Sequence, residues 1–182
     1  MLMTMIVHVF TVGGLMTNCY VASCEETREA VIIDPAFDNR LKAERIFKFI
    51  DESALKVKLI VNTHGHPDHT CGNGVVKERF QTPILIHEYD APMLGAFGER
   101  IAGFFGFQNT SPPADTLLHD GDLVNFTNNS LASGINHHEH RPDHCVPADC
   151  VFVGDDACCH NGGNESRAHG HAPDFSGRAH KN

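Results

Sequence analysis

The sequence predicts one α/β domain, and three observations support this fold class. The chain has 182 residues and a mass of 20.0 kDa, which suits one domain rather than two. Hydrophobic residues make up 41% of the chain and charged residues 20%, so there are enough apolar side chains to fill a core. Segments typical of strands alternate with segments typical of helices, which favours the α/β class.

The first part of the chain supplies most of the expected elements. The apolar residues Leu41, Ile46, Phe49 and Ile50 recur near helical spacing and predict a helix over residues 39–53. Runs of apolar and β-branched residues predict strands. The expected strands cover residues 5–12, 18–23, 30–33, 57–61 and 83–86, and a second helix is expected over residues 74–80.

The later part of the chain is less regular. Residues 91–114 contain Gly, Phe and a Pro-Pro pair, and predict a partly helical insertion or a mobile loop, with a plain connection as the alternative. Residues 117–126 predict a hairpin with Asp120-Gly121 at its turn. Beyond Phe126, where 8 of the 14 His and 4 of the 7 Cys lie, apolar periodicity is poor.

Charge and composition narrow the function classes. The formal net charge of −9 argues against binding to nucleic acid or to an anionic membrane, because both need basic patches. There is no apolar run of about 18–20 residues and no basic, cleavable leader, so we expect a cytoplasmic protein. Many His residues without a secretion signal indicate metal chemistry before disulfides.

A dense histidine cluster follows a predicted buried strand and precedes a glycine-rich helix start. It reads Thr63-His64-Gly65-His66-Pro67-Asp68-His69. Side chains two apart in an extended chain point the same way, so His64 and His66 can share one metal ion. Pro67 suits the first turn of a helix, which re-aims Asp68 and His69 toward a second position. The motif predicts two ligand pairs whose nitrogen and oxygen donors suit Zn²⁺, and also Fe or Mn.

This segment resembles the Thr-His-x-His-x-Asp-His signature of the metallo-β-lactamase-fold hydrolases. The run Val31-Ile32-Ile33-Asp34-Pro35 is similar to the family's early strand that ends in an Asp near the metals. The nearest subgroup looks like the glyoxalase II-like (hydroxyacylglutathione hydrolase-like) proteins. The resemblance implies a metallo-β-lactamase-like αββα sandwich, of α+β or α/β class, that lacks its last strand-helix layer. We expect this domain over residues 1–160, followed by a poorly ordered His-rich tail over residues 161–182.

The same resemblance implies further metal ligands. A third histidine is expected at His140, with the neighbouring His137, His138 and His144 as alternatives. A bridging carboxylate is expected at Asp155, at the end of a Val-Phe-Val-Gly-Asp run. The last family ligand would be His171, but only fifteen residues separate it from Asp155, so it stays outside the expected set. The expected metal ligands are His64, His66, Asp68, His69, His140 and Asp155.

The resemblance implies a two-zinc hydrolase, with iron or manganese as alternative metals, that attacks thioesters or related small acyl compounds with a metal-bound hydroxide. Asp68 is the expected catalytic residue. Asp34 and Thr63 are candidates for fixing the imidazole tautomers, with simple turn and cap duties as the alternative. A second hypothesis is an iron-dependent persulfide dioxygenase, or another oxidoreductase on this fold. A third is a non-catalytic or truncated metal-binding remnant. The acyl group and the oligomeric state stay open.

Two further residues have simple structural interpretations. His87 is expected to be a satisfied histidine within a strand. Cys71 is expected to be a small buried residue at a helix start.

Overall fold

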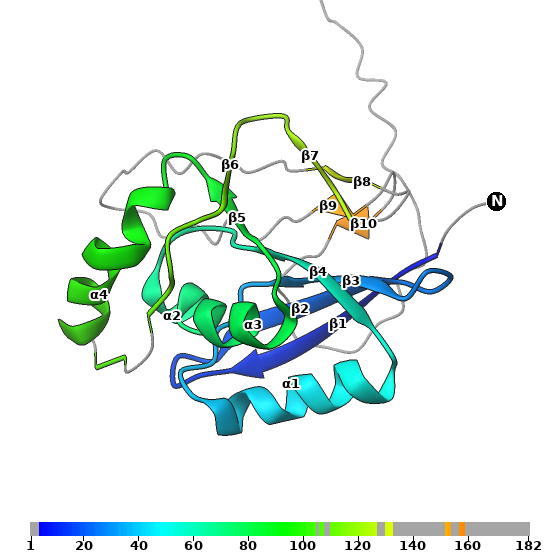
Figure 1. Cartoon of the computed structure of the whole chain (residues 1–182), viewed down its shortest axis with the longest axis horizontal. Helices are drawn as coiled ribbons and strands as arrows, with labels where there is room; N and C mark the ends of the chain where they lie inside the picture. The colour runs from blue at the N-terminus through cyan, green and yellow to red at the C-terminus, as the bar shows by residue number, and fades with distance from the viewer. Residues whose placement is uncertain are drawn as a thin grey trace, which may run out of the picture.

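Within the part of the chain that the structure describes, the strands form two sheets (Figure 1). The computed structural model describes residues 4–104, 106–107, 110–126, 130–132, 152–153 and 157–158. The first sheet, in strand order, consists of β1 (Met5–Val12), β2 (Thr17–Cys24), β3 (Glu29–Ile33), β4 (Lys56–Val61), β5 (Ile84–His87) and β6 (Thr116–Leu118). The second sheet, in strand order, consists of β10 (Ala157–Cys158), β9 (Phe152–Val153), β8 (Ser130–Ala132) and β7 (Leu123–Asn125).

The first sheet is mixed, and β3 near its centre is buried on both faces. β1, β2 and β3 pair antiparallel, whereas β3, β4, β5 and β6 pair parallel. Side chains of β3 alternate between two hydrophobic clusters: Ile32 belongs to one, and Val31 and Ile33 belong to the other. Burial on both faces explains why this strand is apolar at consecutive positions.

Helix α1 (Arg40–Glu52) forms where the sequence predicts a helix over residues 39–53. The Asn39 side chain accepts a hydrogen bond from the backbone N of Lys42 at 3.0 Å and so caps the first turn. Leu41, which belongs to the apolar pattern, faces solvent with 78% of its surface exposed. The buried residues of α1 are Ala43, Ile46 and Ile50.

The two faces of the first sheet pack against different layers. On one face, Ile46 of α1 and Val76 of α3 (Asn73–Phe80) share a cluster with the strand residue Ile60, and Figure 1 shows both helices on that face. On the other face, Val124 of β7 packs in the cluster that contains Val31 and Ile33. The described elements therefore stack as helices, first sheet and second sheet.

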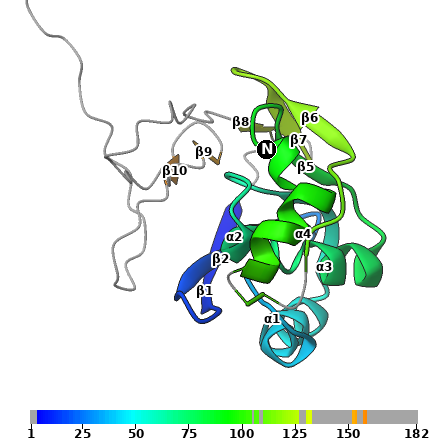
Figure 2. The same ribbon diagram turned by 90° about the vertical axis from the view of Figure 1, so that its left-hand side faces the viewer.

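Three short helical segments surround the ends of the parallel strands. They are α2 (Pro67–Thr70), the 3-10 turn η1 (Ala91–Met93) and α4 (Gly95–Phe104). Figure 2 shows α4 beside α2. The partly helical insertion predicted within residues 91–114 is thus confirmed.

The predicted hairpin at residues 117–126 is wrong. β6 pairs parallel with β5 in the first sheet, whereas β7 pairs antiparallel with β8 in the second sheet. The turn between them is present, because Asp122 N donates to His119 O at 3.1 Å and Gly121 has a φ of +84°. Leu118 and Val124 belong to one hydrophobic cluster. Packing between the sheets therefore outweighs local pairing of the two strands.

Several predictions concern residues outside the described ranges. These are the end of the domain at residue 160, the tail at residues 161–182 and the missing last layer. Within the described ranges, no helix combines the length and apolar character needed to span a bilayer.

Candidate metal centre

The histidine motif lies at the carboxyl ends of the parallel strands. Asp34 directly follows β3, and residues 63–72, which we name the histidine loop, follow β4 after Asn62. Because β2 runs antiparallel to β3, its first residue, Thr17, lies at the same edge. Open α/β sheets commonly bind their ligands at this edge.

The loop is shaped by a proline and two tightly packed glycines. Pro67 occupies the first turn of α2, as the sequence predicts, and His66 stands before it in extended backbone with φ −63° and ψ 139°. A Cβ at Gly65 would lie 2.6 Å from Met93 Cβ, and one at Gly72 would lie 2.2 Å from the Pro35 carbonyl oxygen. Neither glycine can carry a side chain without moving its neighbours.

His64 and His66 form the first donor pair. His64 Nε2 lies 3.0 Å from His66 Nδ1, and the ring centroids are 4.5 Å apart. Two nitrogens that bind one tetrahedral Zn²⁺ at about 2.0–2.1 Å lie roughly 3.3 Å apart. The structure therefore brings the two nitrogens to about the separation that one shared ion requires.

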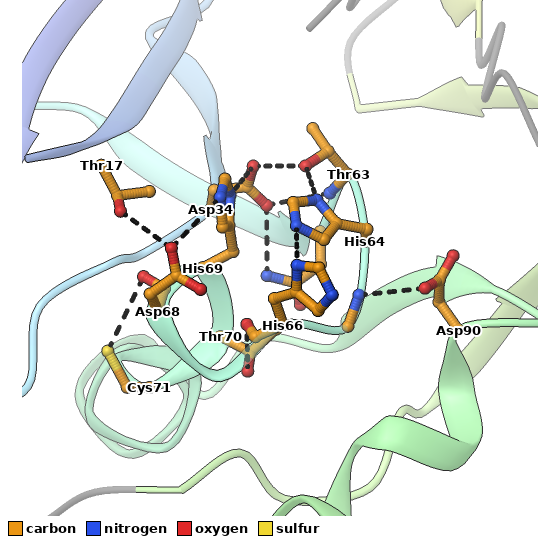
Figure 3. Close-up of polar contacts among 12 residues, drawn as sticks. Thr17, Asp34, Thr63, His64, His66, Asp68, His69, Thr70, Cys71 and Asp90 are labelled. Carbon is orange, nitrogen blue, oxygen red and sulfur yellow. Dashed lines mark hydrogen bonds and ion pairs between the residues drawn. The ribbon is translucent and has the colours of Figure 1, made fainter. Parts of the chain in front are cut away.

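Asp34 anchors the loop through its buried carboxylate, which contacts Thr63 and His69 (Figure 3). Its side chain is 2% exposed, and its backbone has a φ of +48°, a conformation that costs energy for a residue other than glycine. Oδ1 accepts a hydrogen bond from Thr63 N at 2.8 Å, and Oδ2 accepts from Thr63 Oγ1 at 2.6 Å. Oδ2 also accepts from His69 Nδ1 at 2.9 Å.

These contacts fix two imidazole tautomers. Thr63 Oγ1 donates its proton to Asp34, so it accepts a hydrogen bond from His64 Nδ1 at 3.0 Å. His69 Nδ1 donates directly to Asp34. In both rings the proton sits on Nδ1 and the lone pair on Nε2. Metal-binding histidines are commonly oriented in this way, and the expectation that Asp34 and Thr63 hold the rings agrees with these contacts.

Asp68 and His69 form the second donor pair. Asp68 Oδ2 lies 3.6 Å from His69 Nε2. Thr17 Oγ1 donates to Asp68 Oδ2 at 3.1 Å and so orients the carboxylate. The His64 and His69 ring centroids are 4.0 Å apart, so the two donor pairs lie side by side.

The pKa of His64 reflects this crowding. Burial, the largest cause, and the neighbouring His69 together lower the pKa of His64 to about 4, although the Asp34 carboxylate opposes the shift. His64 is therefore neutral at pH 7, the protonation state in which an imidazole binds a metal ion.

The donors fit a metal centre that takes additional ligands from elsewhere. Within the described residues, no three His, Cys, Asp or Glu side chains already converge as a complete ligand set. The two pairs instead offer imidazole nitrogens and a carboxylate oxygen, and the Nδ1 side of two rings is held by the half-buried Thr63 and the buried Asp34. The other expected ligands, His140 and Asp155, and the excluded candidate His171 lie outside the described residues, so the structure does not place them.

The sequence did not single out Asp90 and Thr17. Asp90 Oδ1 accepts a hydrogen bond from Gly65 N at 3.2 Å, and Figure 3 shows it on the opposite side of the loop from Thr17. The one signal in the sequence was that Thr17 directly precedes the strand expected over residues 18–23. The interpretation of Cys71 agrees with the structure, because Cys71 is buried. That of His87 agrees in part: it is a buried strand residue whose Nδ1 accepts from Tyr89 N at 3.4 Å, but its Nε2 lies 3.4 Å from Asp120 Oδ1 without forming a hydrogen bond.

The comparison with protein families settles the family. Residues 12–155 match the metallo-beta-lactamase superfamily. The chain belongs to this superfamily. Its members include metal-dependent hydrolases, and the fold predicted from the resemblance is confirmed.

Three relatives illustrate the range of this superfamily. A protein of Aquifex aeolicus is 34% identical over 122 residues, 66% of this chain and 54% of that protein. The probable metallo-hydrolase YqgX of Bacillus subtilis is 25% identical over 153 residues, 79% of this chain and 70% of that protein. The mitochondrial persulfide dioxygenase ETHE1 of Mus musculus is 43% identical over 163 residues, 75% of this chain and 62% of that protein. The chain therefore spans 54% to 70% of the length of these relatives.

Two solved structures share the fold. The B3 metallo-beta-lactamase BLEG-1 superposes with a TM-score of 0.60 at 24% identity, covering 70% of this chain and 59% of that one. The di-iron-bound form of TTHA1623 superposes with a TM-score of 0.56 at 25% identity, covering 69% of this chain and 59% of that one.

Proposed function

We propose that this protein is a metal-dependent hydrolase of thioesters or related small acyl compounds. The observation that carries the proposal is the pair of donor sets, His64 with His66 and Asp68 with His69, backed by one buried carboxylate. The proposal includes two zinc ions, held also by His140 and by the bridging Asp155. We further propose that no nucleic acid or membrane is a partner, because the net charge is −9. A small-molecule substrate and a cytoplasmic location belong to the same proposal.

When bound, such ions lower the pKa of a water molecule toward neutrality and polarise the acyl oxygen. The chain's own residues then have defined tasks. Asp68, held by Thr17, would accept a proton from the attacking water or orient it. Asp34 and Thr63 would keep the Nε2 lone pairs of His64 and His69 directed at the metals.

The hydrogen bonds already made by the two ring protons favour a thioester as the substrate. The Nδ1 protons of His64 and His69 are donated to Thr63 and Asp34, so neither is free to protonate a leaving group. A thiol has a pKa of about 8.5, so a thiolate leaves near neutral pH without a strong acid, whereas an amine or alkoxide needs one. This argument supports the substrate class of the glyoxalase II-like proteins that the sequence resembles.

The test is elemental analysis of the purified full chain together with thioester turnover, measured as released thiol. We expect zinc and turnover in the wild type. His66→Ala should lower the metal content and reduce turnover by about 100-fold or more. His119→Ala serves as a control, because it removes a histidine that is 60% exposed and lies outside the loop. Unchanged metal content in His66→Ala would refute the assignment of the loop.

A second candidate is an iron-dependent persulfide dioxygenase. The 43% identity to the mouse persulfide dioxygenase favours it. It needs only one iron ion, held by two His and one Asp. Iron in the purified protein, with oxygen uptake in the presence of a persulfide and no thioester turnover, would replace the hydrolase proposal by this one. If the wild-type chain binds no metal under any loading condition, both enzyme proposals fail and the hypothesis of a non-catalytic remnant stands.

A further inference from the structure

The side chains of Asn62 and Asn73 pair across the base of the histidine loop. Asn62 directly precedes the loop, and Asn73 directly follows it as the first residue of α3. Asn73 Nδ2 donates to Asn62 Oδ1 at 2.7 Å, and Asn62 Nδ2 donates to Asn73 Oδ1 at 3.2 Å. The two amides therefore join the two ends of the loop through reciprocal hydrogen bonds.

This amide pair is fully buried and extends in two directions. Both side chains are 0% exposed, where an unpaired amide would be costly. Asn62 Nδ2 also lies 3.5 Å from Asp34 Oδ1, at the limit of a hydrogen bond. On the other side, Asn73 Nδ2 donates to Ser111 Oγ at 2.8 Å. A continuous polar path thus runs from the segment after α4 to the carboxylate that holds the imidazoles.

We propose that Asn73 is a positioning residue for the metal centre: its amide pair with Asn62 fixes the separation of the loop ends and supports Asp34. This inference rests on the proposed metal binding. A shift of the loop ends would move the metal ligands, because His64 and His66 lie toward the end that follows Asn62 and His69 lies toward the end that precedes Asn73. If the ends move apart, the two donor pairs separate and each ion loses part of its ligand set.

A purely structural role would have a different signature. Such a role would lower the stability of the folded chain but leave its metal affinity unchanged at temperatures where the chain is folded. A positioning role lowers the affinity of the folded protein itself. Val76, a buried residue of the same helix outside the amide pair, supplies the matched control, because Val76→Ala destabilises through a cavity alone.

The experiment measures the Zn²⁺ affinity of the metal-stripped full chain by competition with a chromophoric chelator, well below the unfolding temperature. Asn73→Ala should bind Zn²⁺ about 10–100-fold more weakly than the wild type, the range typical for residues that orient metal ligands. Val76→Ala should stay within about twofold of the wild type despite a lower Tm. With Co²⁺ as the probe, Asn73→Ala should also change the visible absorption bands.

The outcomes separate the two proposals. Wild-type affinity in a folded Asn73→Ala protein overturns this inference and leaves the proposed function standing. A wild-type chain that binds neither Zn²⁺ nor Co²⁺ overturns the proposed function itself. If Asn73→Ala does not fold, Asn73→Asp, which keeps the volume but loses the donors, is measured in the same way. If neither variant folds, the pair supports the fold as a whole and the positioning role is refuted.

Discussion

The histidine loop and the turn at residues 119–122 have similar composition but different surroundings. Both follow a strand of the first sheet and place His and Asp side chains together. The loop is backed by Asp34, which is 2% exposed. In the turn, His119 Nδ1 lies 3.2 Å from Asp122 Oδ2 and its Nε2 lies 3.7 Å from Glu88 Oε2, but the His119 side chain is 60% exposed.

The difference shows what a site needs beyond suitable residue types. In the loop, a buried carboxylate holds two imidazoles, one directly and one through Thr63, in a single tautomer. In the turn, the same kinds of side chain lie in solvent, where such ion pairs contribute little. The buried acceptor, and not the count of histidines, distinguishes the candidate metal centre.

The largest expected effect comes from removing that acceptor. Asp34→Ala leaves the Thr63 N–H, the Thr63 hydroxyl and the His69 ring without their partner, and each unsatisfied buried group costs about 1–3 kcal/mol. We expect a loss of about 4 kcal/mol in the free energy of unfolding, together with loss of bound metal. Urea denaturation and elemental analysis measure both. Asp122→Ala in the turn should leave the unfolding midpoint near that of the wild type. Equal effects from the two variants would show that burial of the carboxylate does not distinguish the loop from the turn.

The second prediction concerns pH in the metal-free protein. The pKa of His64 is about 4 in the folded chain and about 6.5 when unfolded, so the unfolded state binds more protons between these values. The stabilisation from this group is complete above about pH 6.5 and is lost as the pH falls toward 4, by up to ~3 kcal/mol. Urea unfolding across this range should show the slope, and His64→Gln should flatten it. An equal slope in both proteins would contradict the burial of the neutral ring.

The third prediction compares two glycines. Gly72→Ala would place a Cβ 2.2 Å from the Pro35 carbonyl oxygen, so we expect a loss of about 2–3 kcal/mol. Gly121 has open space around it, and Gly121→Ala should cost only about 1 kcal/mol from its φ of +84°. Thermal unfolding of both variants checks the order. A reversed order would mean that the loop tolerates backbone movement more readily than the turn.

Among the substitutions that weaken the support of the histidine loop, Asp90→Ala should have the smallest effect. Loss of the hydrogen bond from Gly65 N, at 3.2 Å, should lower the free energy of unfolding by about 1 kcal/mol. Glu88→Ala near the turn should change it by less than about 0.5 kcal/mol, because its contact to His119 is 3.7 Å long and exposed. Denaturant titration resolves the two values. Indistinguishable results would show that Asp90 does not support the loop.

Local patterns predicted most of the helices and strands. Asn39 marks the start of α1, and Pro67 marks the start of α2, because capping and ring geometry are local properties. The roles of Asp34 and Thr63 were expected from the resemblance, and their contacts agree with it. His64, His66, Asp68 and His69 lie together, although their metal binding remains a prediction.

Features set by distant contacts could not be read from the sequence. The hairpin prediction failed because β6 and β7 pair with strands of different sheets. Leu41 fits a helical pattern but faces solvent, since apolar spacing does not state where the core lies. The pairing of Asn62 with Asn73 joins residues eleven positions apart, and neither residue type indicates burial.

The anchoring of the histidines by Asp34 has a consequence for protein engineering. The signature from Thr63 to His69 is not a portable module, because its ring orientation depends on a carboxylate twenty-nine or more positions earlier in the chain. Grafting the signature onto another scaffold would transfer the metal-binding side chains but not the contacts that fix their imidazole tautomers. A successful transplant must import the end of β3, with its left-handed Asp34 backbone, as well as the end of β4.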